Sequence, residues 1–451
     1  MDRTDKITPD YAQRHPWESY SKALATEYRQ CLDEGRDVYR YNKLFDAIAG
    51  LPDSEGKDKL ADTLFDMLQS LPQTGGYPYI EPSSYDEILK ECVPVECVFN
   101  TLPKDMMLDK IRGAVYGRIC GCLLGKPVEG MRRDQLISFL KESGNYPMTR
   151  YIGRSDVENI GEYFFPIRQR VYDDGQLSGM PVDDDTNYII LALMTILKYK
   201  RSFTPGNVAE LWVNSQPKNA YCTAERVAFR NFVDGFLPPY SAVYKNPFRE
   251  WIGAQIRGDL FGWICPGDPK TAALYAWKDA SISHVKNGIY GEMFVSAMLA
   301  AAGAGAGIRD AIKIGISYIP RFSRLYRAVN DVIACFDAGK TSDEFFADFL
   351  KQWNDTVAYD WCHTIPNAEI VTAALLWGNG DYGKTVCLAV QQGFDTDCNG
   401  ATAGSVVGMV NGFSGIDRYW TSKISGTLFT SIFGYEKVDV DALAQQVFDL
   451  I

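Results

Sequence analysis

Two acidic clusters lie far apart in the sequence, and each stands at the start of an apolar, helix-like run. The first is Asp183-Asp184-Asp185, and the second is Asp395 with Asp397. Carboxylates beside hydrophobic sequence are costly to bury unless a cation or hydrogen bonds neutralise them. Because hard divalent cations prefer oxygen ligands, two converging clusters would suit Mg2+, Mn2+ or Ca2+. The pattern therefore predicts a metal site to which both clusters contribute.

Each cluster also has a simpler interpretation. An aspartate just before an apolar helix is a good N-cap, and acidic residues suit the positive end of a helix. Three consecutive carboxylates exceed what one cap needs, however, and they repel one another unless a cation intervenes. The Asp395-Thr-Asp397 motif could be a surface Asx turn, but the small, apolar run over 401–410 indicates burial. Metal binding is the stronger interpretation of the pair.

Few other residues suggest chemistry. The chain holds three histidines, so a metal centre must depend mainly on oxygen ligands. His284 could contact a ligand, and Gly288 and Gly291 would let backbone approach that ligand. Tyr290 could stack on a base or ribose. The alternative, a structural histidine beside core aromatics, stays open. No Walker loop and no G-x-S-x-G elbow occurs.

Composition excludes several classes of protein. The chain has 451 residues and a formal net charge of −11, which argues against a broad nucleic-acid footprint. Eleven cysteines without a C-x-x-C pair indicate reduced thiols rather than a disulfide framework or a zinc ribbon. The N-terminus lacks an apolar signal core, and no apolar run of about 18 residues occurs. We therefore expect a cytoplasmic protein without a membrane span; the oligomeric state is left open.

Helices are predicted on both sides of the acidic residues. The helix predicted over 109–125 carries a glycine at every fourth position, and the helix predicted after the second cluster repeats the device. These glycines are Gly113, Gly117, Gly121 and Gly125, then Gly404, Gly408 and Gly412. Residues four apart share a helix face, so each helix offers a smooth groove to another backbone. Glycine weakens a helix by about 1 kcal/mol relative to alanine, so close packing is the expected compensation.

The rest of the chain also favours helices. Apolar spacing predicts helices over 57–71, 291–302, 368–376 and 384–391, and strand-like alternation is scarce. An irregular loop, with at most a short helix, is expected over 145–180. We therefore predict an all-α protein with two parts. Residues 1–105 would form a helical extension packed on a main domain over 106–451.

At these residues the sequence resembles the ADP-ribosylglycohydrolases, a family that includes the dinitrogenase-reductase-activating glycohydrolases and the crystallin J1-like proteins. The resemblance spans about 106 to 435. It is carried by the glycine-striped run 113–125 with Pro127-Val-Glu129, by Asp183-Asp184-Asp185-Thr186, and by Gly393-Phe-Asp395-Thr-Asp397. It implies a compact orthogonal helical bundle around two divalent cations, usually Mg2+. It also implies hydrolysis of the bond between ADP-ribose and a protein side chain, or of a related ADP-ribosyl link.

The resemblance assigns roles to single residues. It implies that Asp184, Asp185, Asp395 and Asp397 are metal ligands. It also places Glu129 near the scissile bond, where Glu129 or a metal-bound aspartate such as Asp185 or Asp397 would take a proton from the attacking water. The glycine-rich backbone over 288–291 could then hold the diphosphate, because exposed N–H groups bind anions.

Two positions depart from the family pattern. The family usually has Thr or Ser at the position of Asp183, and it often has Thr or Ser at the position of Cys398. A thiol is a soft, poor ligand for Mg2+. We therefore expect that one hard ligand has moved from 398 to 183, so that Asp183 joins the metal ligands.

Three functions are compatible with this sequence. The first is hydrolysis of an N- or O-glycosidic bond in an ADP-ribosylated protein or an ADP-ribosyl small molecule. The second is a glycohydrolase of small nucleosides or nucleotides, which the altered ligands and the extra N-terminal region make plausible. The third is an ADP-ribose-binding or structural protein without turnover, as the lens crystallins of the family illustrate.

Overall fold

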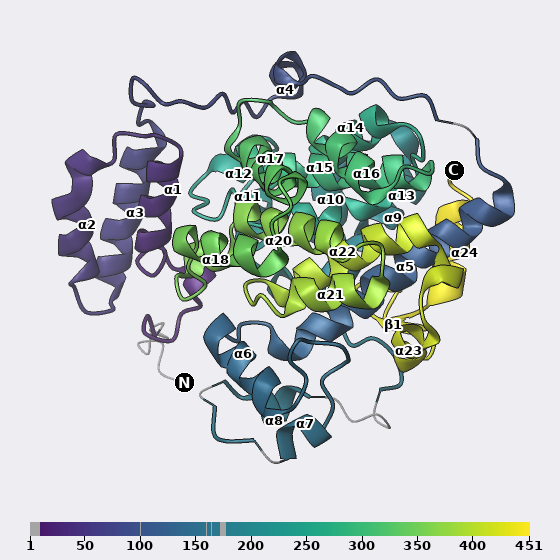
Figure 1. Cartoon of the computed structure of the whole chain (residues 1–451). Helices are drawn as coiled ribbons and strands as arrows, with labels where there is room; N and C mark the ends of the chain where they lie inside the picture. The colour runs from purple at the N-terminus through teal and green to yellow at the C-terminus, as the bar shows by residue number, and fades with distance from the viewer. Residues whose placement is uncertain (1–9, 100, 159, 164, 172–176) are drawn as a thin grey trace, which may run out of the picture.

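Nearly all regular structure in this protein is helical. The computed structural model describes residues 10–99, 101–158, 160–163, 165–171 and 177–451 (Figure 1). Within these residues the only strands are β1 (Thr427–Phe429) and β2 (Lys437–Asp439), which pair antiparallel with Leu428 opposite Val438. The predicted all-α class is confirmed.

The helices form three groups: an N-terminal group, a central group and a group that surrounds the centre. The first group is α1 (Leu24–Asp33), α2 (Asn42–Ala49), α3 (Glu55–Gln69) and α4 (Tyr85–Glu91). The helices at the centre of the molecule are α5 (Lys104–Gly125), α9 (Asp184–Tyr199), α13 (Asp259–Trp263), α15 (Lys286–Gly303), α20 (Thr364–Trp377), α21 (Tyr382–Val390) and α22 (Thr396–Asn411). The remaining helices surround them and are α6 (Arg133–Glu142), α7 (Ser155–Glu158), α8 (Ile167–Arg170), α10 (Pro205–Ser215), α11 (Thr223–Val233), α12 (Tyr240–Val243), α14 (Pro269–Ala280), α16 (Ile308–Ser317), α17 (Arg324–Asp337), α18 (Ser342–Gln352), α19 (Ala358–Cys362), α23 (Arg418–Thr421) and α24 (Val440–Phe448).

The predicted helices occur close to their expected bounds. The segments 57–71, 291–302, 368–376 and 384–391 fall on α3, α15, α20 and α21. Helix α15 is buried from Asn287 to Gly303, which explains why its sequence is apolar on every side. In the described part of 145–180 the chain is irregular and holds only the four-residue helices α7 and α8. This agrees with the predicted loop.

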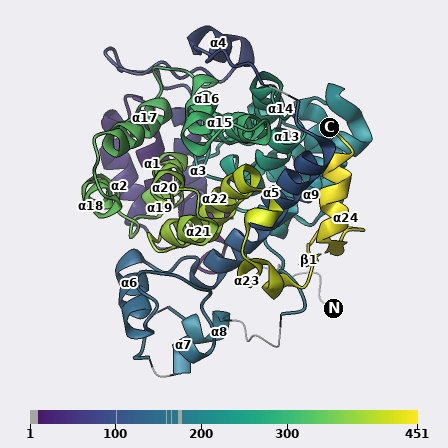
Figure 2. The same cartoon turned by 45° about the vertical axis from the view of Figure 1, so that its right-hand side comes forward.

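The glycine-striped helices α5 and α22 pack against each other along their lengths (Figures 1 and 2). A Cβ added at Gly117 would lie 2.2 Å from the carbonyl oxygen of Gly404, and one added at Gly121 would lie 2.0 Å from that of Gly400. The contact is reciprocal, because a Cβ at Gly404 would lie 2.2 Å from the carbonyl oxygen of Gly117. The predicted backbone-to-backbone packing is confirmed, and the two stripes are each other's partner. We call this contact the glycine seam.

Residues 10–99 wrap around the central helices. Helices α1–α3 stand together at one side, and the chain then crosses the top through α4 before it enters α5 (Figure 1). Buried ion pairs connect this segment to the remainder of the chain. Arg249 pairs with Glu27 at 2.7 Å and with Glu34 at 2.9 Å, and Arg324 pairs with Glu81 at 2.9 Å. The division at 105/106 into two domains stays a prediction.

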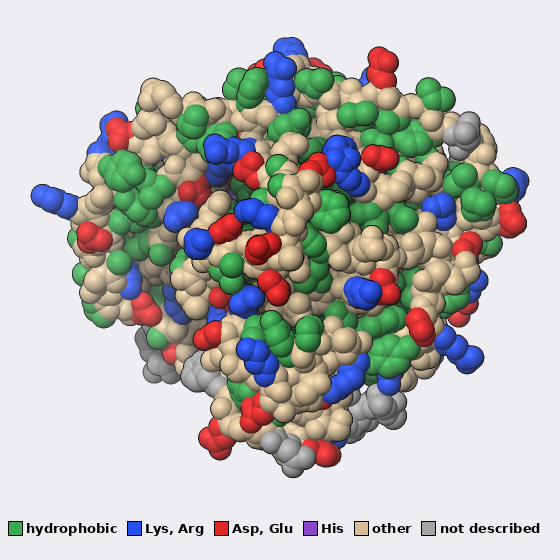
Figure 3. All heavy atoms as spheres, viewed as in Figure 1, with side chains coloured by type: hydrophobic (Ala, Val, Ile, Leu, Met, Phe, Trp, Pro, Cys, Tyr) green, Lys and Arg blue, Asp and Glu red, His purple; other side chains and the backbone are tan. Residues whose placement is uncertain are grey.

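Three further properties of the described residues concern the expected membrane span, the cysteines and the surface charge. None of their helices is long and apolar enough to cross a membrane. All eleven cysteines are free thiols. On the face shown in Figure 3, basic and acidic side chains are interspersed.

Candidate metal centre

The first acidic cluster forms the start of α9. Asp183 is the N-cap, and its Oδ1 accepts a hydrogen bond from the backbone N–H of Asp185 at 2.9 Å. Its Oδ2 accepts another from Nζ of Lys126 at 2.7 Å. The capping interpretation is therefore correct for Asp183, whose two carboxylate oxygens both have protein partners. The side chains of Asp184 and Asp185 take no part in this cap.

Asp185 points into the interior of the protein. Its side chain is fully buried, and its Oδ1 accepts a hydrogen bond from Nη2 of Arg118 at 2.8 Å. Arg118, on α5, is also fully buried and pairs with Asp259 at 2.9 Å. The other oxygen of Asp185, Oδ2, has no hydrogen-bond partner among the residues that the structure describes. An unpartnered carboxylate oxygen in the interior is costly, and a cation would satisfy it.

The second acidic cluster forms the start of α22. Asp395 is the N-cap residue, and its Oδ2 accepts a weak hydrogen bond from the Cys362 thiol at 3.6 Å. Asp397 lies in the first turn of the helix, is buried, and has an Oδ1 without a partner in the described part of the chain. The surface-turn interpretation is wrong for this motif, because both carboxylates are buried.

The two clusters meet. One carboxylate oxygen of Asp185, one of Asp397 and the sulfur of Cys398 all lie within 4.8 Å of one another. A second group with the same spacing joins Asp185 to Asp183 and Cys122. Asp185 thus belongs to both groups. The convergence predicted from the sequence is present, and which of these atoms hold a metal ion stays a prediction.

The glycine seam explains how such distant residues come together. The C-terminal end of α5 lies on the N-terminal end of α22, since a Cβ added at Gly125 would lie 2.2 Å from the carbonyl oxygen of Thr396. The hydroxyl of Thr396 also donates a hydrogen bond to the Gly125 carbonyl at 3.0 Å. The same end of α5 supplies Cys122 and, through the short 3-10 turn Lys126–Val128, Glu129. One helix contact therefore sets the positions of the Cys122 thiol and of Glu129, the predicted base.

The more open side of the cluster carries Glu129 and Asp184. Glu129 has 37% of its side chain exposed, and its Oε2 accepts a hydrogen bond from Nη2 of Arg170 at 3.1 Å. Burial, followed by the charges of Asp183 and Asp395, raises the pKa of Glu129. Burial and the neighbouring carboxylates, Asp183 foremost, raise the pKa of Asp184 to about 8. Both groups thus lie within electrostatic reach of the rest of the cluster.

The inner carboxylates are perturbed in the same direction. Burial, with repulsion from the other carboxylates, raises the pKa of Asp185 and of Asp397 well above the usual range. Burial also raises the pKa of Asp395. Carboxylates this close cannot all ionise without a cation among them. The donor set and the two orphaned oxygens therefore fit a bound divalent cation.

The residues proposed for substrate contact lie elsewhere in the interior. His284 is fully buried with its Nδ1 2.8 Å from the Ser283 hydroxyl, and burial lowers its pKa well below the usual value. The hydroxyl of Tyr290 donates a hydrogen bond to the carbonyl of Pro82.

Gly288 and Gly291 are enclosed in the same way. An added Cβ would lie 2.7 Å from the carbonyl oxygen of Arg249 at Gly288, and 2.6 Å from the methyl carbon of Thr364 at Gly291. The structure gives these four residues partners outside the acidic clusters, so a role in substrate binding stays a prediction.

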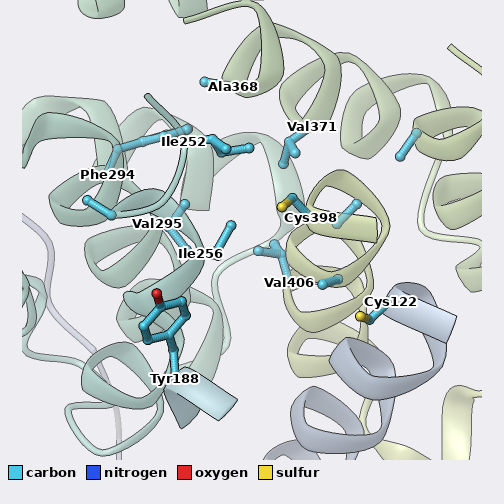
Figure 4. Packing of buried hydrophobic residues seen from close by; sticks show 14 of the residues in the cluster. Cys122, Tyr188, Ile252, Ile256, Phe294, Val295, Ala368, Val371, Cys398 and Val406 are labelled. Carbon is cyan, nitrogen blue, oxygen red and sulfur yellow. The ribbon is translucent and has the colours of Figure 1, made fainter. Parts of the chain in front are cut away.

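Sequence reasoning singled out Cys398 but missed Cys122, Cys222 and the cations that surround the carboxylates. Cys122 and Cys398 lie on adjacent helices among apolar core side chains (Figure 4). Cys222 lies close enough to Asp184 for that carboxylate to raise the pKa of its thiol, after burial. One signal was available for Cys122, because it follows Gly121 in the glycine stripe. Nothing in the sequence signalled that Lys126 would pair with Asp183.

Comparison with known proteins agrees with this geometry. The model of the ADP-ribosylglycohydrolase family matches residues 103–451. Among solved structures, a chain described as an ADP-ribosylglycohydrolase-related protein complex is similar in fold, with a TM-score of 0.50 and 17% sequence identity. The match covers 77% of this chain and 99% of that chain. No curated protein matches the chain. Since the family model spans most of the sequence and includes both acidic clusters, the chain belongs to the ADP-ribosylglycohydrolase family.

Proposed function

We propose that this protein is a metal-dependent hydrolase that cleaves an N- or O-glycosidic bond of an ADP-ribosylated protein or of an ADP-ribosyl small molecule. One observation carries the proposal: Asp185 and Asp397, each with a buried oxygen that is unpartnered among the described residues, belong to one compact donor group in a chain of this family. A purely structural site would leave both oxygens unsatisfied, at a cost of about 1–3 kcal/mol each.

The carboxylates divide into those that hold cations and those that handle protons. Two divalent cations, Mg2+ in first place with Mn2+ or Ca2+ as alternatives, would be held by Asp183, Asp184, Asp185, Asp395 and Asp397. Bound there, they would supply charge that orients the ribose and lowers the pKa of a water molecule. The protein's part is to fix these oxygens, which it does through Arg118 at Asp185 and Lys126 at Asp183.

Glu129 is suited to take the proton of the attacking water. Its side chain is 37% exposed, against 2% for Asp183 and 0% for Asp185, and Arg170 holds one of its oxygens. Its raised pKa brings it nearer to neutral pH, where a general base is most effective. Positive charge that develops on the sugar would be stabilised by the surrounding carboxylates.

The Asp397→Asn variant tests the proposal. It keeps the size of the side chain but removes a charge from the donor group, so Mg2+ binding measured by titration calorimetry and ADP-ribose release should both be lost. Asp348→Asn, on the surface of α18, is the matched control and should leave both unchanged. The substrate screen should include ADP-ribosyl-arginine, ADP-ribosyl-serine, O-acetyl-ADP-ribose and simple nucleosides.

The outcomes separate the competing functions. Turnover of nucleosides alone would favour a nucleoside-type glycohydrolase, and ADP-ribose binding without turnover of any substrate would favour a non-catalytic binder. Full activity in Asp397→Asn would refute the metal-dependent assignment.

A further inference from the structure

Sulfur enters the donor set of this centre twice. The Cys398 sulfur groups with Asp185 and Asp397, and the Cys122 sulfur groups with Asp183 and Asp185. Ligands of one Zn2+ ion lie about 2.3 Å away for sulfur and about 2.1 Å away for oxygen, so any two of them are separated by at most roughly 4.4 Å. The donor atoms of each group, which all lie within 4.8 Å of one another, are therefore close to the spacing that a single ion requires.

The two carboxylates grouped with Cys398 can each offer an oxygen to a cation. Asp185 is fully buried and Asp397 is 3% exposed, and each has an oxygen without a hydrogen-bond partner among the described residues. Asp183, by contrast, has protein partners on both oxygens and belongs only to the Cys122 group. Asp183 therefore does not occupy the ligand position of Cys398, and the expected transfer of a hard ligand from 398 to 183 does not remove sulfur from that position.

We propose that Cys398 is a thiolate ligand of one cation, together with Asp185 and Asp397, and that this subsite selects a borderline-soft divalent cation such as Zn2+ over Mg2+. The inference rests on the proposed function only in requiring a metal at this site. Thiolate ligands favour soft and borderline cations, whereas all-oxygen sites suit Mg2+. On binding, the thiol loses its proton to solvent and the sulfur takes its place in the coordination sphere.

Asp185 would then connect two unlike subsites. Its membership of both groups makes it the bridging carboxylate, with Cys398 on one side and Cys122 with Asp183 on the other. Lys126 neutralises Asp183 on the second side. The first subsite, where no ion pair to Asp397 is present among the described residues, should therefore fill first.

A Co2+ titration tests this inference without an activity assay. Co2+ alone, added to the full-length metal-free protein, should produce a thiolate-to-cobalt charge-transfer band that saturates at one equivalent, and Zn2+ should displace it. In Cys398→Ser the band produced by the first equivalent of Co2+ should disappear, and the Zn2+ affinity of that subsite should fall by at least about tenfold, the loss typical when even an outer partner of a metal ligand is removed. Mg2+ affinity should change much less. Cys335→Ser, on the outer helix α17, is the control and should behave like the unmodified protein.

Each outcome is decisive. Co2+ binding without the charge-transfer band in the unmodified protein would overturn the inference, even if Cys398→Ser failed to fold. So would an unchanged ratio of Zn2+ to Mg2+ affinity in Cys398→Ser. In either case loss of Mg2+ binding and of turnover in Asp397→Asn would leave the proposed function standing. A thiolate band in a protein that hydrolyses no ADP-ribosyl or nucleoside substrate would support the metal ligand and refute the hydrolase.

Discussion

Replacing Gly121 by alanine is the sharpest test of how the glycine seam builds this site. The added methyl group would have to occupy space already filled by backbone, because a Cβ at this position would lie 2.0 Å from the carbonyl oxygen of Gly400. Neither atom belongs to a flexible side chain that could rotate away. Helices α5 and α22 must therefore separate locally.

The size of the effect follows from that distance. Real Cβ contacts are not found below 3.0 Å, so the helices must part by about 1 Å at this point. Alanine gains about 1 kcal/mol of helix propensity over glycine. Overpacking costs about 1–3 kcal/mol and occasionally more, and the opened seam also loses dispersion contacts along both helices. Because the obstruction is rigid backbone, we take the upper end of the overpacking cost, and after the propensity gain we expect a net loss of about 2 kcal/mol in the free energy of unfolding.

The same movement should reach the metal centre. Residue 121 is next to Cys122, and its partner Gly400 is two residues after Cys398. An opening of about 1 Å at this level exceeds the tolerance of a metal site, in which ligand distances vary by about 0.2 Å. Metal affinity should fall together with stability, although no ligand has been changed.

Urea unfolding followed by circular dichroism gives the stability, and calorimetry gives the metal affinity. Gly56→Ala is the matched control, because Gly56 lies on the exposed first turn of α3 and its added Cβ would meet only the Ser54 hydroxyl, at 3.9 Å. That variant should be as stable as the parent protein or slightly more stable. A Gly121→Ala protein with unchanged stability and unchanged metal affinity would refute the reasoning.

Three further predictions concern charge. Asp184→Asn should raise the thermal midpoint of the metal-free protein at pH 8, because it removes a half-buried carboxyl whose pKa is raised to about 8 by desolvation and by Asp183. It should also reduce the rise in the midpoint that Mg2+ produces, and an unchanged metal-induced shift would contradict this. Burial likewise raises the pKa of Glu369 from its usual 4.5 to about 8, so the native state keeps a proton that the unfolded chain loses, and stability should fall as pH rises between these values. Glu369→Gln should flatten that part of the urea-unfolding profile, and a slope equal to that of the parent would refute the assignment. Arg249→Met leaves Glu27 buried without an ion-pair partner among the described residues, while Glu34 keeps Arg36, and it should cost about 3–5 kcal/mol in urea unfolding. Arg309→Met, which breaks an exposed pair, should leave the curve unchanged, and equal effects would show that burial is not the cause.

The sequence predicts those parts of the fold that depend on local residue types and their spacing. The stripe from Gly113 to Gly125 predicts a close helix contact, because glycine in a helix is unfavourable unless something approaches it. The acidic clusters predict their own convergence, because isolated buried carboxylates are too costly. Each inference needs only the residue types and their spacing, so each holds without knowledge of the partner.

Other features depend on partners that only the folded chain brings together. Arg249 pairs with Glu27 and Glu34, which are distant from it in the sequence. Neither segment has a residue pattern that predicts the other as its partner. His284 looks like a ligand contact in sequence, yet the fold places it at full burial against Ser283. The sequence could reveal that polar groups must be satisfied, but the choice of partner is a property of tertiary packing.

Both acidic clusters lie at helix N-termini, which raises the question whether the helix dipoles alone could keep their carboxylates ionised. Asp184 and Asp397 both lie in the first turn of a helix, α9 and α22, each 16 residues long, where the positive end of the helix dipole favours a negative charge. That contribution is about 0.3–2 kcal/mol for each helix. The rise in the pKa of Asp184 from 3.8 to about 8 corresponds to an upper bound of about 6 kcal/mol against its ionised form. The helix dipoles are therefore too weak to keep these carboxylates ionised, so either protons or metal ions must neutralise them. Near neutral pH Glu129 and its neighbours would have to act as bases, and bound protons would prevent this. Metal ions are therefore the counter-charge that is compatible with the proposed catalysis.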